Sequence, residues 1–371
     1  MFKMSIKPQW MMEGPDKVRR PLHQLIALLA IVDELGQLAA ASKKLGVSYR
    51  YAWELVRVGT RTFGAPLLTM TRGRGATLTP LGKKLLWAEK RIAARLAPTL
   101  DSSASELEVE IENVLSDLKP TVRIHASHGF AIEMLRDFLL SMHVPVDLKY
   151  RATMEVLASL AGSNCDLAGF HVPLGEMQAP TLKFYIKWLR PDGQTLINLA
   201  TRRQGIMIAA QNPKRILSIE DLAKPGLRFV NRQFGSGTRI LLDLLLKRHA
   251  VDSQQIAGYA SGETTHSGVA AYIASGMADA GFGVETAARR MGLDFVPVVS
   301  ERYFLMCNSE TLASPMVTRI RDVLSSKEFK AAAGNVPGID VTQAGTTLSL
   351  REAFPNLSSP SAKSRAATKV P

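Results

Sequence analysis

Residues 36–82, GQLAAASKKLGVSYRYAWELVRVGTRTFGAPLLTMTRGRGATLTPLG, constrain the fold of this 371-residue chain more than any other stretch. A short apolar helix, a turn at Gly46, a second helix with a polar face and a basic hairpin follow one another with few residues between them. Gly46 supplies the positive φ angle that a tight turn between helices requires, and Ser48 is a favourable N-cap for the next helix. This order predicts a winged helix-turn-helix, which lays one helix in the major groove of DNA.

The second helix of this segment offers polar side chains for contact with DNA, while Ala52, Leu55 and Val56 form its inward stripe. Arg50, in the first turn, suits a guanine, and Arg57 suits a phosphate. The predicted DNA contacts are Ser48, Tyr49, Arg50, Trp53 and Arg57 on the helix and Arg72 and Arg74 on the hairpin. Alternative interpretations are a core position for Trp53 and an ordinary solvated loop for the two hairpin arginines.

The distribution of charge agrees with a polyanionic partner at the N-terminus. Residues 1–100 contain 17 basic and 6 acidic residues, whereas residues 101–118 contain 6 acidic residues and no basic ones. A basic segment followed by an acidic one is typical of a DNA-binding unit joined to a linker.

Composition and cysteine usage indicate an intracellular protein of two or three domains. Hydrophobic residues make up 46% of the chain, enough for ample cores. The longest early apolar run, Leu25–Val32, is too short to span a bilayer, and the first twenty residues contain no signal-peptide pattern. Cys165 and Cys307 are isolated, so we expect free buried thiols, a reducing compartment and a cytoplasmic location without a membrane partner.

Four regions follow from the patterns along the chain. Residues 1–82 form the DNA-binding domain. Residues 83–118 form a linker with a helix to about Leu96, an interruption at Pro98, and a second helix with an apolar stripe (Leu107, Ile111, Val114, Leu115 and Leu118). The stripe could pack on its own domain, but beside a DNA-binding unit it more often pairs with a second chain, which predicts a homodimer. Residues 119–345 alternate strands with helices and predict an α/β domain of two lobes with mainly parallel sheets. Residues 355–371 have few apolar side chains and predict a disordered tail.

The α/β region carries polar turns between strands and helices, where free backbone N–H groups favour an anion. LINLA and GIMIAA are predicted as two separate strands, with Arg203 and Gln204 between them at a crossing between the lobes. The predicted ligand contacts are Ser127, His128, Arg203, Gln204, Ser236, Gly237, Thr238, Arg239, Thr265 and His266.

The residues of these turns give little evidence for catalysis, metal binding or nucleotide binding. GSGT is equally typical of an ordinary capped helix, Arg239 could be a structural ion-pair partner, and His128 and His266 could be structural. The histidines form no metal-ligand pattern with cysteines or carboxylates. Ser236 lacks the sequence around a nucleophile elbow, and no Walker loop follows the first strand. We therefore expect no catalytic residues, no metal and no cofactor, and not an enzyme.

Two stretches of the chain resemble known families. Residues 22–82 resemble the N-terminal domain of ModE-type molybdate-responsive regulators and the related LysR-type winged helix-turn-helix, in LGVSYRYAWELV, FGAPLL and LTPLG. Residues from about 120 to 345 resemble the periplasmic-binding-protein-like domain, in RRQGIMIA, VNRQFGSGTRILLDLLL, TTHSGVA, ADAGFGV and GLDFVPVVSERYFL.

The resemblance implies a transcription regulator that acts on double-stranded DNA as a homodimer or homotetramer, with a small ligand in the cleft between its lobes and ties to molybdate or tungstate. The anion-binding turns would also accept a small carboxylate, so we expect molybdate or tungstate first and formate or a similar carboxylate second. The resemblance also implies a tie to molybdenum or tungsten enzymes such as formate dehydrogenase. The chain lacks the small domains that bind molybdate in ModE-type regulators. The alternative is a cytoplasmic anion-binding or molybdenum-cofactor-associated protein that uses its helix-turn-helix only for dimerisation.

Overall fold

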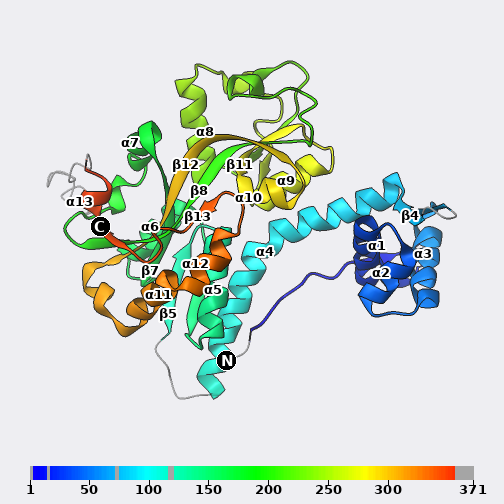
Figure 1. The fold of residues 1–371 in the computed structure, drawn as a ribbon, viewed down its shortest axis with the longest axis horizontal. Helices are drawn as coiled ribbons and strands as arrows, with labels where there is room; N and C mark the ends of the chain where they lie inside the picture. Colours follow the sequence, from blue (N-terminus) through cyan, green and yellow to red (C-terminus); the bar gives the residue numbers. More distant parts are fainter. Residues whose placement is uncertain (1–2, 15–16, 72–74, 116–120, 356–371) are drawn as a thin grey trace, which may run out of the picture. The chain divides into compact units, whose positions relative to one another are not determined.

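The computed structural model describes residues 3–14, 17–71, 75–115 and 121–355 (Figure 1). The chain divides into two compact units, one of Lys7–Arg95 and one of Met1–Ile6 with the chain from Leu96 onward. Within the described ranges, no helix is both long and apolar enough to cross a membrane. The predicted hairpin arginines Arg72 and Arg74 lie outside the described residues, as do residues 356–371 of the predicted tail.

In the described part of the unit Lys7–Arg95, three complete helices, the start of a fourth and two antiparallel strand pairs surround one core. Its elements are β1 Met11–Glu13, β2 Arg19–Pro21, α1 His23–Leu35, α2 Leu38–Leu45, α3 Tyr49–Phe63, β3 Leu68–Thr71 and β4 Gly75–Leu78, followed by the start of α4. The helices and the hairpin occur in the predicted order. Gly46 adopts φ 76° between α2 and α3, and Ala52 and Val56 are buried on α3 as expected.

The β3–β4 hairpin is attached to the turn between α1 and α2. The backbone N–H of Ala76 donates to the carbonyl of Gly36 over 2.7 Å. A Cβ atom at Gly75, where φ is 92°, would lie only 2.1 Å from that carbonyl oxygen. Glycine at this position is therefore required by both the backbone conformation and the close approach.

Helix α4, Pro80–Leu115, is continuous, and the predicted interruption at Pro98 is wrong. Pro98 has no backbone N–H to donate, but side chains that follow it in the helix make other hydrogen bonds. Ser102 Oγ donates to the Pro98 carbonyl over 2.7 Å. Farther along, Ser105 Oγ donates to the carbonyl of Val146 and accepts from the N–H of Leu148. These bonds satisfy backbone groups of the edge strand β6 (Val146–Tyr150) and hold the helix in place.

The predicted apolar stripe of α4 is only partly covered. Leu107 and Ile111 are half-buried, whereas Val114 and Leu115 are 85% and 69% exposed. Leu118 lies outside the described residues. The buried contact of this part of α4 is instead polar, because Arg136 Nη2 on α5 lies 2.7 Å from Glu108 Oε2 and both side chains are buried.

The larger unit consists of two lobes that share one mixed sheet of strand order β10-β9-β11-β8-β12-β7-β5-β6. The first lobe contains β5 Val122–Ala126, α5 Phe130–Ser141, β6 Val146–Tyr150, α6 Thr153–Ala161, β7 Leu167–Pro173 and α7 Gln178–Leu182, and later α11 Pro315–Ser325, α12 Lys327–Gly334 and α13 Leu350–Ala353. The second contains β9 Phe229–Arg232, α8 Gly237–Arg248, β10 Gly262–Glu263, α9 His266–Ala274, β11 Ala280–Val284 and α10 Glu285–Arg290.

Two strands of fifteen residues, β8 Gln194–Ile208 and β12 Asp294–Asn308, connect the lobes and pair antiparallel along their lengths (Figure 1). The short strands β13 Ile339–Asp340 and β14 Thr347–Ser349 also pair with β8. LINLA and GIMIAA are therefore parts of one strand, and the expectation of mainly parallel sheets holds only within each lobe. The polar residues that suggested a break are paired across to β12.

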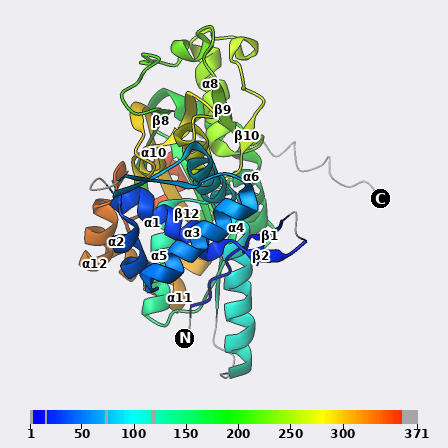
Figure 2. The same cartoon turned by 90° about the vertical axis from the view of Figure 1, so that its right-hand side faces the viewer.

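Each lobe buries side chains on both faces of its part of the sheet. In the first lobe, one core lies under α5, α11 and α12, and the other lies under α6 and α13. In the second lobe, the two cores lie under α8 and under α9 and α10. Figure 2 shows α8, β9 and β10 at one end of this unit and α5 and α11 at the other. Cys165 and Cys307 are buried free thiols, as predicted.

Candidate functional site

The outer face of α3 is solvent-exposed along its first turns. Ser48 caps the helix and accepts from the N–H of Tyr51 over 3.2 Å. Tyr49 and Trp53 are 52% and 45% exposed, and Arg50 is exposed beside them. Trp53 therefore does not belong to the core, and three adjacent predicted DNA contacts point to solvent.

Arg57 is engaged within its own helix. Its Nη2 atom lies 2.7 Å from Glu54 Oε2, and Arg61 Nη2 lies 3.4 Å from the other oxygen of that carboxylate. The hydrogen bond from Arg57 holds the pKa of Glu54 below its ordinary value. Glu54 takes the Nε and Nη2 donors of Arg57, so a phosphate would meet the remaining donors or compete with this carboxylate.

A second candidate site lies where β8 and β12 cross between the lobes. Glu301 on β12 faces Arg202 on β8 in the antiparallel register. Its Oε2 atom lies 3.0 Å from Arg202 Nε and 2.9 Å from Arg202 Nη2, and it accepts from Gln204 Nε2 over 2.6 Å. Gln204 Nε2 also donates to Thr238 Oγ1 over 3.2 Å, and this bond joins the crossing strands to the start of α8.

The first lobe adds aromatic and hydroxyl groups beside Arg202. Tyr303, next to Glu301 on the same face of β12, donates its hydroxyl to the Ser127 carbonyl over 2.6 Å. The ring of His171 stacks on Tyr303 with centroids 3.8 Å apart. Ser127 Oγ lies 2.9 Å from Thr153 Oγ1. A Cβ atom at Gly237 would lie 3.3 Å from that same Thr153 hydroxyl, so the start of α8 in the second lobe approaches the first lobe closely.

The second lobe contributes two helix N-termini and a buried arginine. Ser236 caps α8 and Thr265 caps α9 through side-chain oxygens that accept backbone N–H groups. Arg232, at the end of β9, donates to the carbonyls of Glu263 and Thr264 over 3.3 and 2.8 Å. His266, in the first turn of α9, is buried.

Burial and neighbouring charge set the protonation of this cluster. Burial, followed by the charges of the two arginines, lowers the pKa of His171 and of His266 well below the ordinary value. Burial, followed by the charge of Arg202, lowers the pKa of Arg232 to about 9, against an opposing effect of Glu263. Both imidazoles are therefore neutral near pH 7, and Arg232 remains charged.

Three buried polar atoms of the cluster have no hydrogen-bond partner in the described part of the chain: His171 Nε2, Gln204 Oε1 and His266 Nδ1. An unpaired buried polar group is costly, so three close to one another indicate a place for a ligand. A pocket of about 10 Å³ on the Arg202 and Tyr303 side of this cluster is also lined by Gly129, Phe130 and Ile339, and its lining does not include the three unpaired atoms. That volume holds about one water molecule.

The structure brings together some of the predicted ligand residues and separates others. Ser127, Gln204, Ser236, Gly237, Thr238, Thr265 and His266 lie in or beside the cluster. Arg239 instead binds Asp243 over 3.1 Å and stacks on Tyr259. Arg203 is half-exposed and binds Glu285 over 2.6 Å. His128 lies 2.9 Å from Glu133.

Sequence reasoning missed Arg202, Arg232, Glu301, His171 and Tyr303. His171, Arg202, Glu301 and Tyr303 lie inside strands, where local patterns give no sign of a site, whereas Arg232 lies at the end of β9, in the polar segment after LRFV, and was not chosen as a contact. Arg232 offered the strongest signal, because a charged residue that directly follows the strand sequence LRFVN stands at the carboxyl end of that strand, where ligands of α/β sheets gather.

The fold is that of a known class of binding domain. A model of the PBP superfamily domain matches residues 140–325, about half of the chain. The chain belongs to the PBP superfamily.

Individual relatives extend this result. The uncharacterised Bacillus subtilis protein YvgK is 27% identical over 250 residues, which cover 66% of this chain and 79% of YvgK. The molybdenum-pterin-binding protein MopB of Rhodobacter capsulatus is 34% identical over 113 residues, which cover 29% of this chain and 41% of MopB. Among solved structures, CbnR, a LysR family transcriptional regulator, is similar with a TM-score of 0.37 and 18% identity, over 81% of this chain and 98% of CbnR.

Proposed function

We propose that this protein is a ligand-responsive transcription regulator that binds double-stranded DNA through a winged helix-turn-helix in residues 1–82. The observation that carries the proposal is the exposed face of α3, where Tyr49, Arg50 and Trp53 follow the Ser48 cap in the first turns. First-turn residues of a recognition helix are those that reach base edges. The strands β3 and β4 flank the Arg72–Arg74 segment, and the basic balance of residues 1–100 suits a phosphate backbone.

The effector proposed for the PBP superfamily domain is a small anion bound at the crossing of β8 and β12. The buried Arg232, the partly buried Arg202 and the two capped helix starts supply donors for such a ligand. The name of the relative MopB favours molybdate or tungstate, and control of genes for a molybdenum or tungsten enzyme such as formate dehydrogenase would fit that effector. Formate or another small carboxylate is the second choice.

A regulator of this kind works on cytoplasmic DNA as a homodimer or homotetramer. The exposed Val114 and Leu115 at the end of α4 support an interface within residues 83–118. A two-fold DNA site matches a two-fold protein, because each copy then reads one half-site.

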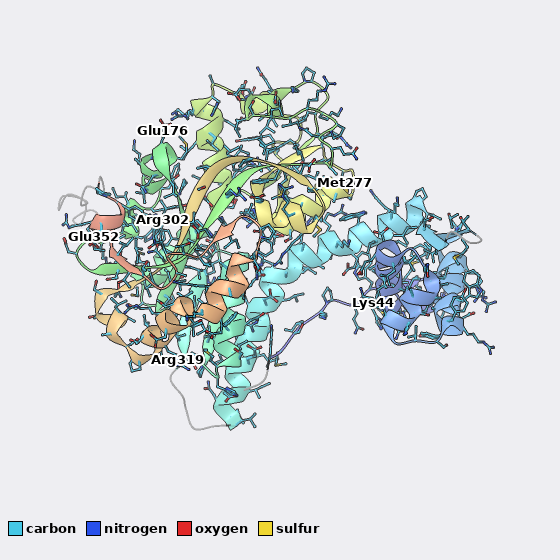
Figure 3. The ribbon with its side chains drawn as sticks, viewed as in Figure 1. Lys44, Glu176, Met277, Arg302, Arg319 and Glu352 are labelled. Carbon is cyan, nitrogen blue, oxygen red and sulfur yellow. The ribbon has the colours of Figure 1, made fainter. Side chains whose placement is uncertain are left out.

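Fluorescence anisotropy with DNA from upstream of the protein's own gene tests the DNA-binding proposal. Arg50→Ala should weaken binding by about 5- to 150-fold, the loss of one bidentate base contact of about 1–3 kcal/mol. Lys44→Ala is the matched control, because Lys44 is also an exposed basic residue but lies on α2 and binds Glu34 over 2.7 Å (Figure 3). Equal affinities for the wild type and both variants would contradict recognition through α3.

The second candidate function is an anion-binding or molybdenum-cofactor-associated protein whose N-terminal unit serves only dimerisation. The name of MopB, a molybdenum-pterin-binding protein, favours it. This function predicts anion binding without any DNA complex, so the same anisotropy experiment separates the two candidates.

A further inference from the structure

The amide of Gln204 has a defined orientation in the cluster. Its Nε2 atom lies 2.6 Å from the Glu301 carboxylate and 3.2 Å from Thr238 Oγ1. The opposite orientation would place the amide oxygen against the carboxylate, two acceptors with no hydrogen between them. Gln204 Oε1 is therefore the amide atom that neither Glu301 nor Thr238 binds. It is fully buried and has no partner among the described residues, so the cluster lacks a hydrogen-bond donor at this point.

Arg232 determines the second property of the ligand, a negative charge. It is buried and donates to two backbone carbonyls, yet no carboxylate of the described residues lies within 4 Å of its guanidinium. The carboxylate of Glu263 lies instead at the start of α9, because a Cβ atom at Gly268 would be 3.1 Å from Glu263 Oε2. A guanidinium has five N–H donors, so Arg232 keeps donors for an incoming anion.

The balance of charge limits that anion. The cluster contains two guanidiniums, those of Arg202 and Arg232, and two buried carboxylates: Glu301, which binds Arg202, and Glu263, which acts on Arg232 from beyond ion-pair distance. Both imidazoles of the cluster are neutral near pH 7. The charges of these two positive and two negative side chains cancel, so only the partial positive charges of the helix N-termini attract an anionic ligand. A dianion such as molybdate would be poorly compensated here, whereas a ligand with one negative charge is matched.

We infer that the ligand is a small carboxylate that carries its own hydrogen-bond donor, a hydroxy acid or an amino acid, rather than a bare oxyanion. Its carboxylate binds at Arg232, and its hydroxyl or amino group donates to Gln204 Oε1. Formate and molybdate offer only acceptor oxygens at neutral pH, so either would leave Gln204 Oε1 unpaired. This inference rests on the proposed ligand site but changes the order of its ligands: a carboxylate with its own donor takes the place of molybdate, tungstate and formate.

Calorimetric titration of the full-length wild-type protein tests the inference directly. Glycolate and propionate are a matched pair, because a methyl group of similar size replaces the hydroxyl. Glycolate should bind more tightly by about 5- to 150-fold, the effect of leaving a buried acceptor unpaired. Glycine in place of glycolate shows whether the donor is an amino or a hydroxyl group. Formate and molybdate should bind more weakly than the better of the two.

Two variants locate the effect. Gln204→Leu should reduce the affinity for glycolate to that for propionate and leave propionate unchanged. Arg239→Met is the control, since Arg239 is bound to Asp243 and should leave every affinity unchanged. If Gln204→Leu does not fold, the comparison of glycolate with propionate in the wild-type protein still tests whether the ligand needs a hydrogen-bond donor.

Equal binding of glycolate and propionate, tightest binding of molybdate, or no binding of any of these ligands would overturn the inference. None of these results affects DNA binding, so the anisotropy experiment with Arg50→Ala still decides the proposed function independently.

Discussion

Replacing Glu301 by glutamine removes the one negative charge that directly binds Arg202 at the crossing of the lobes. In the wild type, Glu301 Oε2 lies 2.9 Å from Arg202 Nη2 and 2.6 Å from Gln204 Nε2, and the carboxylate is buried. The substitution keeps the shape of the side chain but leaves a buried guanidinium without its ion-pair partner. The new glutamine amide can also turn its N–H₂ group toward Arg202 and Gln204, which are both hydrogen-bond donors.

Loss of one partner from a buried ion pair costs about 3–5 kcal/mol. Because the glutamine oxygen can still accept one hydrogen bond, we expect a loss near the lower end, about 3 kcal/mol of the free energy of unfolding. Urea unfolding followed by circular dichroism measures this loss in the transition of the larger unit. The two compact units can unfold separately, so each transition is fitted by itself.

Glu176→Gln is the matched control. Glu176 also pairs with an arginine, Arg248, but its side chain is 70% exposed at the periphery (Figure 3). An exposed pair contributes at most about 1 kcal/mol. If Glu301→Gln changes the free energy of unfolding no more than the control does, the crossing does not depend on this charge, and the electrostatic account of the site is wrong.

Three further predictions address other parts of the chain. Because the folded state holds His171 and His266 neutral, with pKa values well below that of the unfolded chain, their contribution to stability is complete above about pH 6.5 and is lost as pH falls. Each imidazole contributes a slope of up to about 1.4 kcal/mol per pH unit; a flat unfolding free energy between pH 7.5 and 5 would contradict this. Val114→Lys with Leu115→Lys should shift the full-length protein toward monomer in sedimentation, and an unchanged dimer would place the interface elsewhere. Gly75→Ala should lower the melting temperature of the smaller unit, because the new Cβ atom would lie 2.1 Å from the Gly36 carbonyl oxygen. Gly193→Ala, with open space around its Cβ atom, should leave the melting temperature unchanged. Equal melting temperatures for the two variants would refute the close approach at Gly75.

The elements that depend on local signals were predictable from the sequence. Gly46 and Ser48 determine a turn and a cap by their own conformational preferences, so α2 and α3 appear where expected. Ser236 and Thr265 cap their helices for the same reason. Six of the predicted ligand residues in or beside the cluster lie at the ends of helices or strands, which carry local patterns; the seventh, Gln204, lies inside β8.

The features that depend on distant partners were not predictable in this way. The polar residues of β8 suggest a break, yet Arg202 is matched by Glu301, 99 positions away, and the strand continues. The continuity of α4 through Pro98 depends on contacts of Ser102 and Ser105 with β6 that its own sequence does not contain. Arg239 looked like a ligand residue because of its position in a turn, and Asp243 and Tyr259 engage it instead.

A gel shift with the full-length protein and DNA from upstream of its own gene, with and without a small anion, tests the central claim most directly. The account predicts a retarded complex that is sensitive to salt, that Arg50→Ala weakens, and whose affinity changes when an anion that binds at the lobe crossing is added. A protein that binds such an anion but forms no complex, or a complex indifferent both to Arg50→Ala and to every anion bound, would contradict a ligand-responsive regulator.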